Sequence, residues 1–273
     1  MSECNHDCEH CSSSQGCGDK IEKAKLNERS SIKHVIGVLS GKGGVGKSYI
    51  TSLLAVSLAK QGYKVGILDA DITGPSIPKA FGINEQAYGE DNLIYPAQSK
   101  KYGIKIISAN LLLENPTDPI VWRGIMLSNL VKQFYEDVLW EELDYLLIDM
   151  PPGTGDVALT IFQMLPIENL IIVTSPQDLV SVIVTKALKM AEMMNIKVLG
   201  VIENMSYLKC PKCNEQIPIF GTSHLDEFAK KENFKILAKL PLISENATLI
   251  DNGQAEEIYL QEIETAVDAI KEK

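Results

Sequence analysis

A glycine-rich stretch near the start of the sequence is typical of a phosphate-binding loop. Residues 41–48 fit the pattern G-x-x-x-x-G-K-[ST], between an apolar run at 34–40 and a helical pattern at 49–60. Glycines let successive backbone N–H groups face a polyphosphate, and the following helix adds the positive end of its dipole. We expect the Lys47 amine to reach the β- and γ-phosphates and the Ser48 hydroxyl to bind Mg²⁺. The candidate nucleotide contacts are Gly41, Lys42, Gly43, Gly44, Val45, Gly46, Lys47 and Ser48.

Three aspartates near the ends of predicted buried strands extend this candidate site. Asp69 ends the strand predicted at 63–69, Asp71 follows it, and Asp149 ends another strand at 145–149. In α/β sheets, ligands bind outside the carboxyl ends of the strands. The run into Asp149 is typical of a Walker B strand, whose acid holds Mg²⁺. We expect Asp69 near the Mg²⁺ shell and Asp71 to position or activate the attacking water. For Asp69 and Asp71, surface aspartates that cap the next turn are the alternative.

The cysteines form two groups. They are Cys4, Cys8, Cys11 and Cys17, followed by Cys210 and Cys213. In an intracellular chain, such grouping favours metal or redox chemistry over a disulfide framework. The first group has the ligands for an iron–sulfur cluster or for zinc, or it binds no metal, and its spacing does not decide between these. The second group supplies two thiolates, whereas a closed site needs four. Either the first group completes the set, or two chains each contribute a pair about a twofold axis.

The predicted elements that position these residues alternate in type. Strands are expected at 34–40, 63–69, 93–96, 104–108, 145–149, 170–173, 198–202 and 236–241, and helices at 21–33, 49–60, 126–140, from 178, from 224 and twice at the C-terminus. This alternation predicts an α/β fold with a mainly parallel sheet flanked by helices. We expect residues 21–273 to form one P-loop ATPase domain with a C-x-x-C insertion at 210–213, and residues 1–20 to be a flexible tail.

Composition excludes several classes of partner. A hydrophobic content of 45% and a charged content of 23% are ordinary for a globular domain. The net charge of −10 argues against non-specific binding to nucleic acid or to an anionic membrane. No apolar run approaches the roughly 18 residues of a membrane span, and the first twenty residues have no apolar signal-peptide core. We therefore expect a cytoplasmic protein.

Several strings of residues resemble one family when taken together. Lys42, with the glycines and Lys47 that follow, resembles the deviant Walker A motif shared by MinD, ParA, the nitrogenase iron protein and Mrp. The other matching strings are Leu68–Ser76, Asp149–Asp156, Glu203–Ser206 and Cys210–Cys213. On these strings, about residues 30–270 are identified as a member of the Mrp/ApbC family of iron–sulfur carrier ATPases.

The resemblance implies a homodimer that binds ATP and Mg²⁺ and hydrolyses the ATP slowly. Lys42 would cross to the nucleotide of the second subunit, although a solvated loop lysine is the alternative. Asn204 would read adenine, although an asparagine that forms a turn is the alternative. Cys210 and Cys213 of both subunits would bridge a [4Fe–4S] cluster, which upstream assembly proteins supply and apoprotein clients receive.

The N-terminal cysteines also resemble part of a family motif. Eukaryotic cytosolic scaffold relatives carry four N-terminal cysteines ending in C-x2-C-x5-C, a spacing that Cys8, Cys11 and Cys17 reproduce. The first cysteine of those relatives lies further upstream than Cys4 does. The resemblance therefore leaves iron–sulfur, zinc and no metal open for this group.

Two other function classes stay open. A partitioning ATPase of the ParA/MinD type would need a basic surface or a basic amphipathic tail, but residues 256–273 are acidic on balance, and Cys210 and Cys213 would have no role. An ATP-dependent electron donor like the nitrogenase iron protein would also bridge a cluster between two subunits. It would pass on electrons and keep the cluster.

Overall fold

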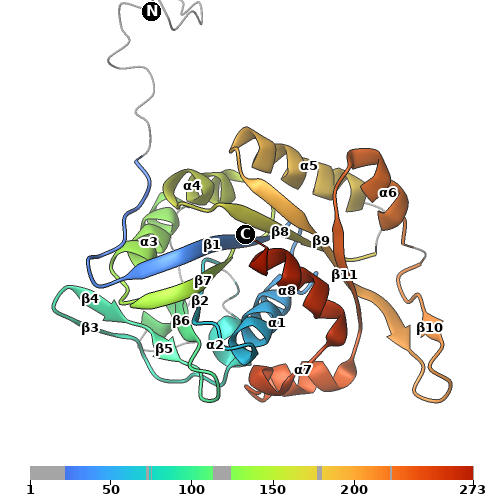
Figure 1. Ribbon diagram of the computed structural model, residues 1–273, viewed down its shortest axis with the longest axis horizontal. Helices are drawn as coiled ribbons and strands as arrows, with labels where there is room; N and C mark the ends of the chain where they lie inside the picture. The colour runs from blue at the N-terminus through green and yellow to red at the C-terminus, as the bar shows by residue number, and fades with distance from the viewer. Residues whose placement is uncertain are drawn as a thin grey trace, which may run out of the picture.

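The computed structural model describes residues 22–71, 74, 76–112, 124–176, 180–221 and 223–272. Within these ranges, nine strands form one sheet in the order β10-β9-β8-β1-β7-β2-β6-β5, with β11 paired to β9 (Figure 1). The strands are β1 (Ser31–Ser40), β2 (Val65–Asp69), β5 (Ala97–Gln98), β6 (Lys105–Ser108), β7 (Glu142–Asp149), β8 (Asn169–Thr174), β9 (Lys197–Lys209), β10 (Gln216–Ile217) and β11 (Ile236–Pro241). A separate hairpin consists of β3 (Tyr88–Glu90) and β4 (Leu93–Tyr95).

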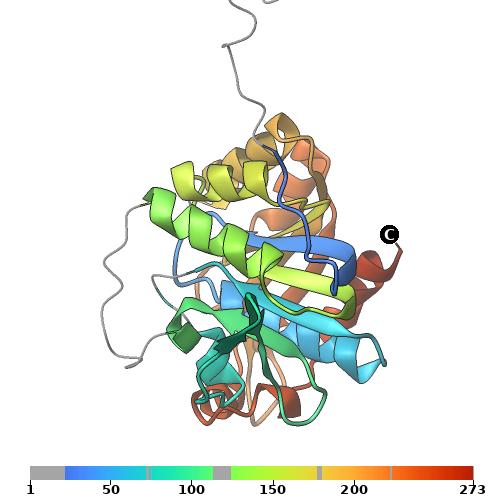
Figure 2. The same cartoon turned by 90° about the vertical axis from the view of Figure 1, so that its left-hand side faces the viewer.

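Helices cover both faces of the sheet (Figures 1 and 2). One face carries α1 (Lys47–Lys60), α2 (Ile77–Ala80), α7 (Ser244–Asp251) and α8 (Glu264–Lys271), and the other carries α3 (Gly124–Glu136), α4 (Asp156–Met164), α5 (Val180–Met193) and α6 (Leu225–Glu232). Short 3₁₀ turns are η1 (Ala109–Leu112), η2 (Ala255–Glu257) and η3 (Gln261–Ile263).

The central strands are apolar on both sides because each side packs under a helical layer. In β1, Ile36 and Val38 belong to the core beneath α1, whereas Val35 and Leu39 belong to the core beneath α3 and α4. This alternation follows the two-residue period of a strand. Strands buried on both faces are typical of parallel sheets.

Parallel pairing confirms the predicted fold class and brings together the carboxyl ends of β1, β2 and β7. β7 lies between β1 and β2 and runs parallel to both, while β5 and β10 pair antiparallel at the margins. The register pairs Asp149 with Val38 on one side and with Asp69 on the other. The end of β1, where the glycine-rich loop begins, therefore lies beside two of the predicted acids.

The structure corrects the type of one predicted element and the extent of others, such as the helix predicted at 126–140, which ends at Glu136. Within the predicted helix at 21–33, the described residues from 22 onward form no helix, and β1 begins at Ser31. The polar groups of this segment bond to other elements instead: Lys23 Nζ donates to the carbonyls of Phe162 and Leu165 at the end of α4. The strand predicted at 198–202 continues in the structure to Lys209.

Candidate nucleotide and thiolate sites

The glycine-rich loop connects β1 to α1 and leaves its backbone open. Gly44 and Gly46 have φ angles of 80° and 84°, in the left-handed region that favours glycine. A Cβ atom at Gly43 or Gly44 would meet no other atom within 4 Å. The loop borders a cavity of about 320 Å³ that Lys47, Asp71 and other residues also line. This volume is within the usual range for small-ligand sites.

Close packing also requires glycine at Gly41 and Gly46 of the loop. A Cβ atom at Gly41 would lie 1.7 Å from Cγ2 of Ile183 on α5. A Cβ atom at Gly46 would lie 2.3 Å from Nδ2 of Asn204 on β9. The loop is therefore clamped between α5 and β9, and its position depends on both.

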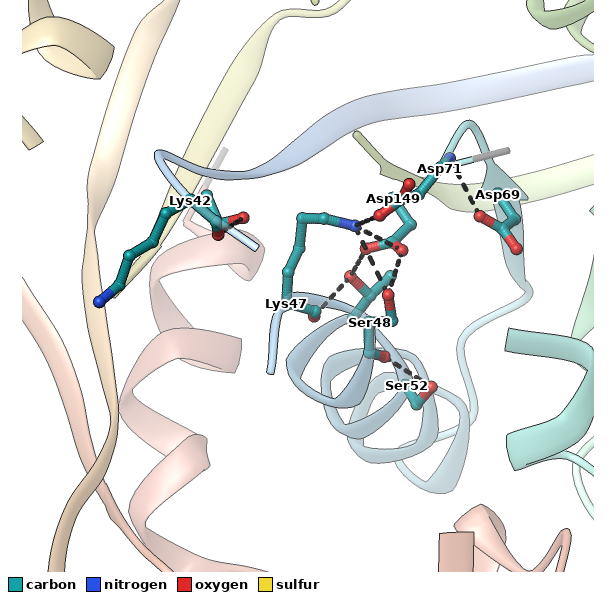
Figure 3. Close-up of polar contacts among 9 residues, drawn as sticks. Lys42, Lys47, Ser48, Ser52, Asp69, Asp71 and Asp149 are labelled. Atoms are coloured by element: carbon teal, nitrogen blue, oxygen red, sulfur yellow. Dashed lines mark hydrogen bonds and ion pairs between the residues drawn. The ribbon is translucent and has the colours of Figure 1, made fainter. Parts of the chain in front are cut away.

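Lys47 is the buried cation of the site (Figure 3). Its Nζ lies 2.7 Å from Oδ2 of Asp149 and 3.3 Å from Oδ2 of Asp71, and only 5% of its side chain is exposed. Burial lowers the pKa of Lys47, but the charges of Asp149 and Asp71 outweigh it, so the pKa is raised. The amine therefore stays charged, as binding to phosphate requires.

Both carboxylate oxygens of Asp149 are held by α1. The Ser48 hydroxyl donates to Oδ2 at 2.6 Å, and the Thr51 hydroxyl donates to Oδ1 at 2.7 Å. Thr51 is fully buried and was not among the predicted site residues. The sequence carries one faint signal for it, since Thr51 lies one helical turn after Lys47 and so on the same face of α1.

Asp69 adds a second buried carboxylate to this end of the sheet. Its Oδ1 accepts a hydrogen bond from the backbone N–H of Asp71 at 3.1 Å, while its Oδ2 is buried without a partner among the described residues. Burial, and then the charge of Asp149, raise the pKa of Asp69 well above its usual range. Two adjacent carboxylates, an orphan oxygen and the Ser48 hydroxyl are a donor set that suits a hard divalent cation such as Mg²⁺.

Lys42 and Asn204 lie around the loop in different ways. The Lys42 side chain points away from Lys47 and the aspartates (Figure 3), and no carboxylate of the described ranges pairs with its amine. The buried amide of Asn204 donates to the carbonyl of Val45 at 2.9 Å. In this structure the Asn204 amide thus supports the loop backbone, and adenine recognition by Asn204 stays a prediction.

Cys210 and Cys213 lie in the turn of the hairpin formed by β9 and β10. The turn is closed by hydrogen bonds from the Cys210 N–H to the Glu215 carbonyl and from the Asn214 N–H to the Cys210 carbonyl, both 2.9 Å. Hydrogen bonds from the backbone N–H groups of Lys212 and Cys213, then from the Cys213 thiol, lower the pKa of Cys210. A lowered pKa favours the thiolate, which is the form that binds metals.

The hairpin holds two thiol ligands and no more. Across the part of the chain that the structure describes, no third histidine, cysteine, aspartate or glutamate joins them in a metal-binding group. Cys4, Cys8, Cys11 and Cys17 lie outside the described residues. A four-ligand site at Cys210 and Cys213 therefore needs ligands from elsewhere.

Comparison with known proteins places this geometry in a family. Residues 31–273 match the ParA family model described as "NUBPL iron-transfer P-loop NTPase". The chain belongs to this family. An iron–sulfur cluster carrier protein of Clostridium perfringens is 46% identical over 258 residues, which cover 92% of this chain and 90% of the relative. A relative of the same description from Methanocaldococcus jannaschii is 46% identical over 261 residues, covering 93% and 90%.

Solved structures of similar proteins agree with the fold. A nucleotide-binding protein from Archaeoglobus fulgidus, solved in complex with ADP, is 41% identical, with a TM-score of 0.75 over 85% of this chain and 94% of that chain. The MinC:MinD complex of Aquifex aeolicus is 20% identical with a TM-score of 0.61, over 88% and 94% of the chains, and supports the fold alone. In the described ranges, no helix has the length and apolarity that a bilayer crossing requires.

Proposed function

We propose that the protein is a cytoplasmic ATPase that carries a [4Fe–4S] cluster between two of its subunits and delivers it to apoproteins. The observation that carries the proposal is that one chain combines a phosphate loop beside buried acids with a pair of cysteines, Cys210 half-buried and Cys213 exposed, that supplies two thiol ligands. Relatives at 46% identity that are named iron–sulfur cluster carriers support the same function.

The nucleotide half of the function uses the residues around Lys47. Its charged amine binds the β- and γ-phosphates, and the open N–H groups at Gly43 and Gly44 bind phosphate oxygens. Ser48, Asp69 and Asp149 hold Mg²⁺, which would neutralise phosphate charge when bound. In this arrangement Asp71 orients the attacking water. The Lys47–Asp71 contact must loosen for the phosphates to enter.

Hydrolysis in this proposal is slow and needs a second copy of the chain. Lys42 points out of its own site, so its amine is available to the nucleotide of a facing subunit. A positive charge supplied from a partner stabilises the transition state of phosphoryl transfer. ATP turnover therefore depends on dimer formation, which suits a switch better than a rapid catalyst.

The cluster is the cargo, and Cys210 and Cys213 are its ligands. The pair is solvent-accessible at the tip of a hairpin, and the lowered pKa of Cys210 prepares a thiolate for iron. A twofold axis would bring two such pairs together and complete four ligands. The N-terminal cysteines remain open to a second cluster, to zinc or to no metal, and assembly proteins upstream are the expected source of the cargo.

Cluster delivery is distinguished from electron delivery by following the iron. The protein is loaded anaerobically with iron and sulfide and mixed with an apoprotein that needs a [4Fe–4S] cluster. We expect iron to move to the acceptor from the wild type, whereas Cys210→Ala has no bridging cluster to transfer. An oxidised cluster that stays on the protein, with electrons in the acceptor, would assign the chain to the electron-donor class.

A further inference from the structure

We propose that Glu203 is a positioning residue that connects the cysteine hairpin to the phosphate loop. Through this connection, bound nucleotide alters the environment of the Cys210 and Cys213 thiols. The inference deepens the proposed function and rests on it for its biological meaning. The contacts that carry it involve Glu203, Ser206 and Ser223, here called the Glu203 cluster.

The Glu203 cluster is a buried carboxylate held by hydroxyl groups. Glu203 is 1% exposed and lies in β9 between Thr174 of β8 and Lys239 of β11. Its Oε2 accepts a hydrogen bond from the Ser206 hydroxyl, and its Oε1 accepts one from the Ser223 hydroxyl at 2.5 Å. No lysine, arginine or histidine of the described ranges pairs with it. An apolar side chain would be easier to bury here, so the carboxylate indicates a need for these specific contacts.

Neighbouring residues of β9 connect two different parts of the molecule. Side chains at consecutive strand positions point to opposite faces. Asn204 accordingly bonds to Val45 in the phosphate loop, while Glu203 bonds to Ser223 in the segment that returns from the hairpin. The phosphate loop and the hairpin segment are thus attached to adjacent residues of one strand.

The same strand runs directly into the first cysteine. β9 ends at Lys209, and Cys210 follows. Between Asn204 and the hairpin, Met205 has a φ of 56°, and the register of β9 against β11 shifts between Lys239 and Pro241. A non-glycine residue in this region is strained and marks a local distortion of the strand. The distortion lies between the contact with the loop and the cysteines.

The hairpin has few other anchors. Residues 211–221 are exposed, and β10 pairs with β9 through only Gln216 and Ile217. Lys209 Nζ lies 3.3 Å from Glu262 of η3, which holds the base of the hairpin and not its return segment. The return segment is fixed by the Ser223 hydroxyl and by the buried Leu225 that follows it, and Ser223 is the residue that bonds to β9 beside Asn204. A shift of the Val45 carbonyl on nucleotide binding reaches the hairpin through Asn204 and this anchor.

The test measures alkylation of Cys210 and Cys213 by iodoacetamide in the full-length, cluster-free protein. Mass spectrometry of the peptide containing both residues gives the rate with and without a non-hydrolysable ATP analogue. In the wild type we expect the analogue to change the alkylation rate by at least about fivefold. Coupling between two sites of a protein commonly has an effect of this size or larger. In Glu203→Ala and Ser223→Ala the change should fall below about twofold, while ATP affinity and basal hydrolysis stay as in the wild type.

Two further variants separate positioning from general loss of structure. Glu203→Gln keeps the shape and a hydrogen-bonding oxygen, so it should keep most of the nucleotide effect. Ser99→Ala is the matched control, since it also removes a serine-to-glutamate hydrogen bond (Ser99 to Glu256, 2.6 Å) at the other end of the sheet. It should behave as the wild type. Should Glu203→Ala fail to fold, Ser223→Ala alone decides.

The inference is overturned if the Ser223→Ala protein responds to the analogue as the wild type does. It is also overturned if the alkylation rate of the wild type does not change when calorimetry shows that the analogue is bound. This assay needs no cluster, so its result does not depend on cluster transfer. A failure of cluster transfer would count against the proposed function and would not change the conclusion about coupling.

Discussion

Two sites connected through β9 are of opposite kinds. Around the phosphate loop, which Asn204 of β9 contacts, Lys47 and Asp149 are buried and hydrogen-bonded within one chain. In the hairpin that follows β9, Cys213 is exposed and Cys210 half-buried, and no third ligand from the described residues joins them. One site is preorganised in a single subunit, whereas the other is incomplete in it. The contrast supports our proposal that one chain binds the nucleotide by itself, whereas the cluster needs ligands from an assembly of chains.

The largest expected effect comes from removing Lys47, the buried cation of the candidate nucleotide site. Lys47→Ala deletes the amine that we propose to form charge-assisted hydrogen bonds to two phosphates, each about 1.5–3 kcal/mol, so ATP affinity measured by calorimetry should fall at least about 100-fold. Lys42→Ala is the control within the same loop. It should keep one-site affinity and lose hydrolysis, because in our proposal its amine serves the other subunit. Equal loss of affinity in both variants would show that Lys42 acts within its own site.

A substitution of Asp71, at the same end of the sheet, is expected to separate ATP binding from ATP hydrolysis. Asp71→Ala should leave ATP affinity within about threefold and lower the rate of hydrolysis at least about 100-fold, as expected when the group that orients the water is removed. Phosphate release in single-turnover experiments with the cluster-free dimer measures this. A rate within threefold of the wild type would remove Asp71 from the reaction.

The sequence predicts a structural feature well when that feature depends on residues that are close together in the chain. The phosphate loop follows from its own residues, since glycines at fixed positions specify the turn between β1 and α1. The segment at 21–33 was predicted as a helix from its charge pattern, but Lys23 and Asn27 bond to carbonyls at the ends of α3 and α4, which are far away in the sequence.

β9 shows the same limit at the candidate sites. The predicted strand stops at Ile202 because the polar residues Glu203 and Asn204 follow. The structure continues it because its backbone pairs further with β11 and β10, while Ser223 and Val45 bond to these two side chains. Thr51 was missed for a related reason: its one faint signal, a position one helical turn after Lys47, does not point to a carboxylate 98 positions away.

Thr51 tests how strongly the complete site is preorganised. Thr51→Val keeps the shape and leaves Oδ1 of Asp149 without its hydroxyl donor, so the free energy of unfolding should fall by about 1.5–3 kcal/mol. Urea denaturation measures the change, and Thr51→Ser should restore most of it. If Thr51→Val is as stable as the wild type, the buried carboxylate does not depend on α1 for its second oxygen.

The smallest effect concerns the chemistry of the incomplete site. The pKa of Cys210 is lowered by backbone N–H groups, so its thiolate persists as the pH falls below the ordinary cysteine value of about 8.5. The pH midpoint of Cys210 alkylation in the metal-free protein should therefore lie below about 8.5. A midpoint at or above that value would mean that the turn does not prepare the thiol for metal binding.

The central claim is that the cluster site is completed by a second chain and not by the N-terminal cysteines. Anaerobic native mass spectrometry of the loaded protein measures iron and oligomeric state together, in the wild type, in a deletion of residues 1–20 and in Cys210→Ala/Cys213→Ala. We predict about four iron atoms on a dimer of the deletion variant and no bridging cluster in the double cysteine variant. Loss of all iron on deletion of residues 1–20, with iron retained in Cys210→Ala/Cys213→Ala, would contradict the account.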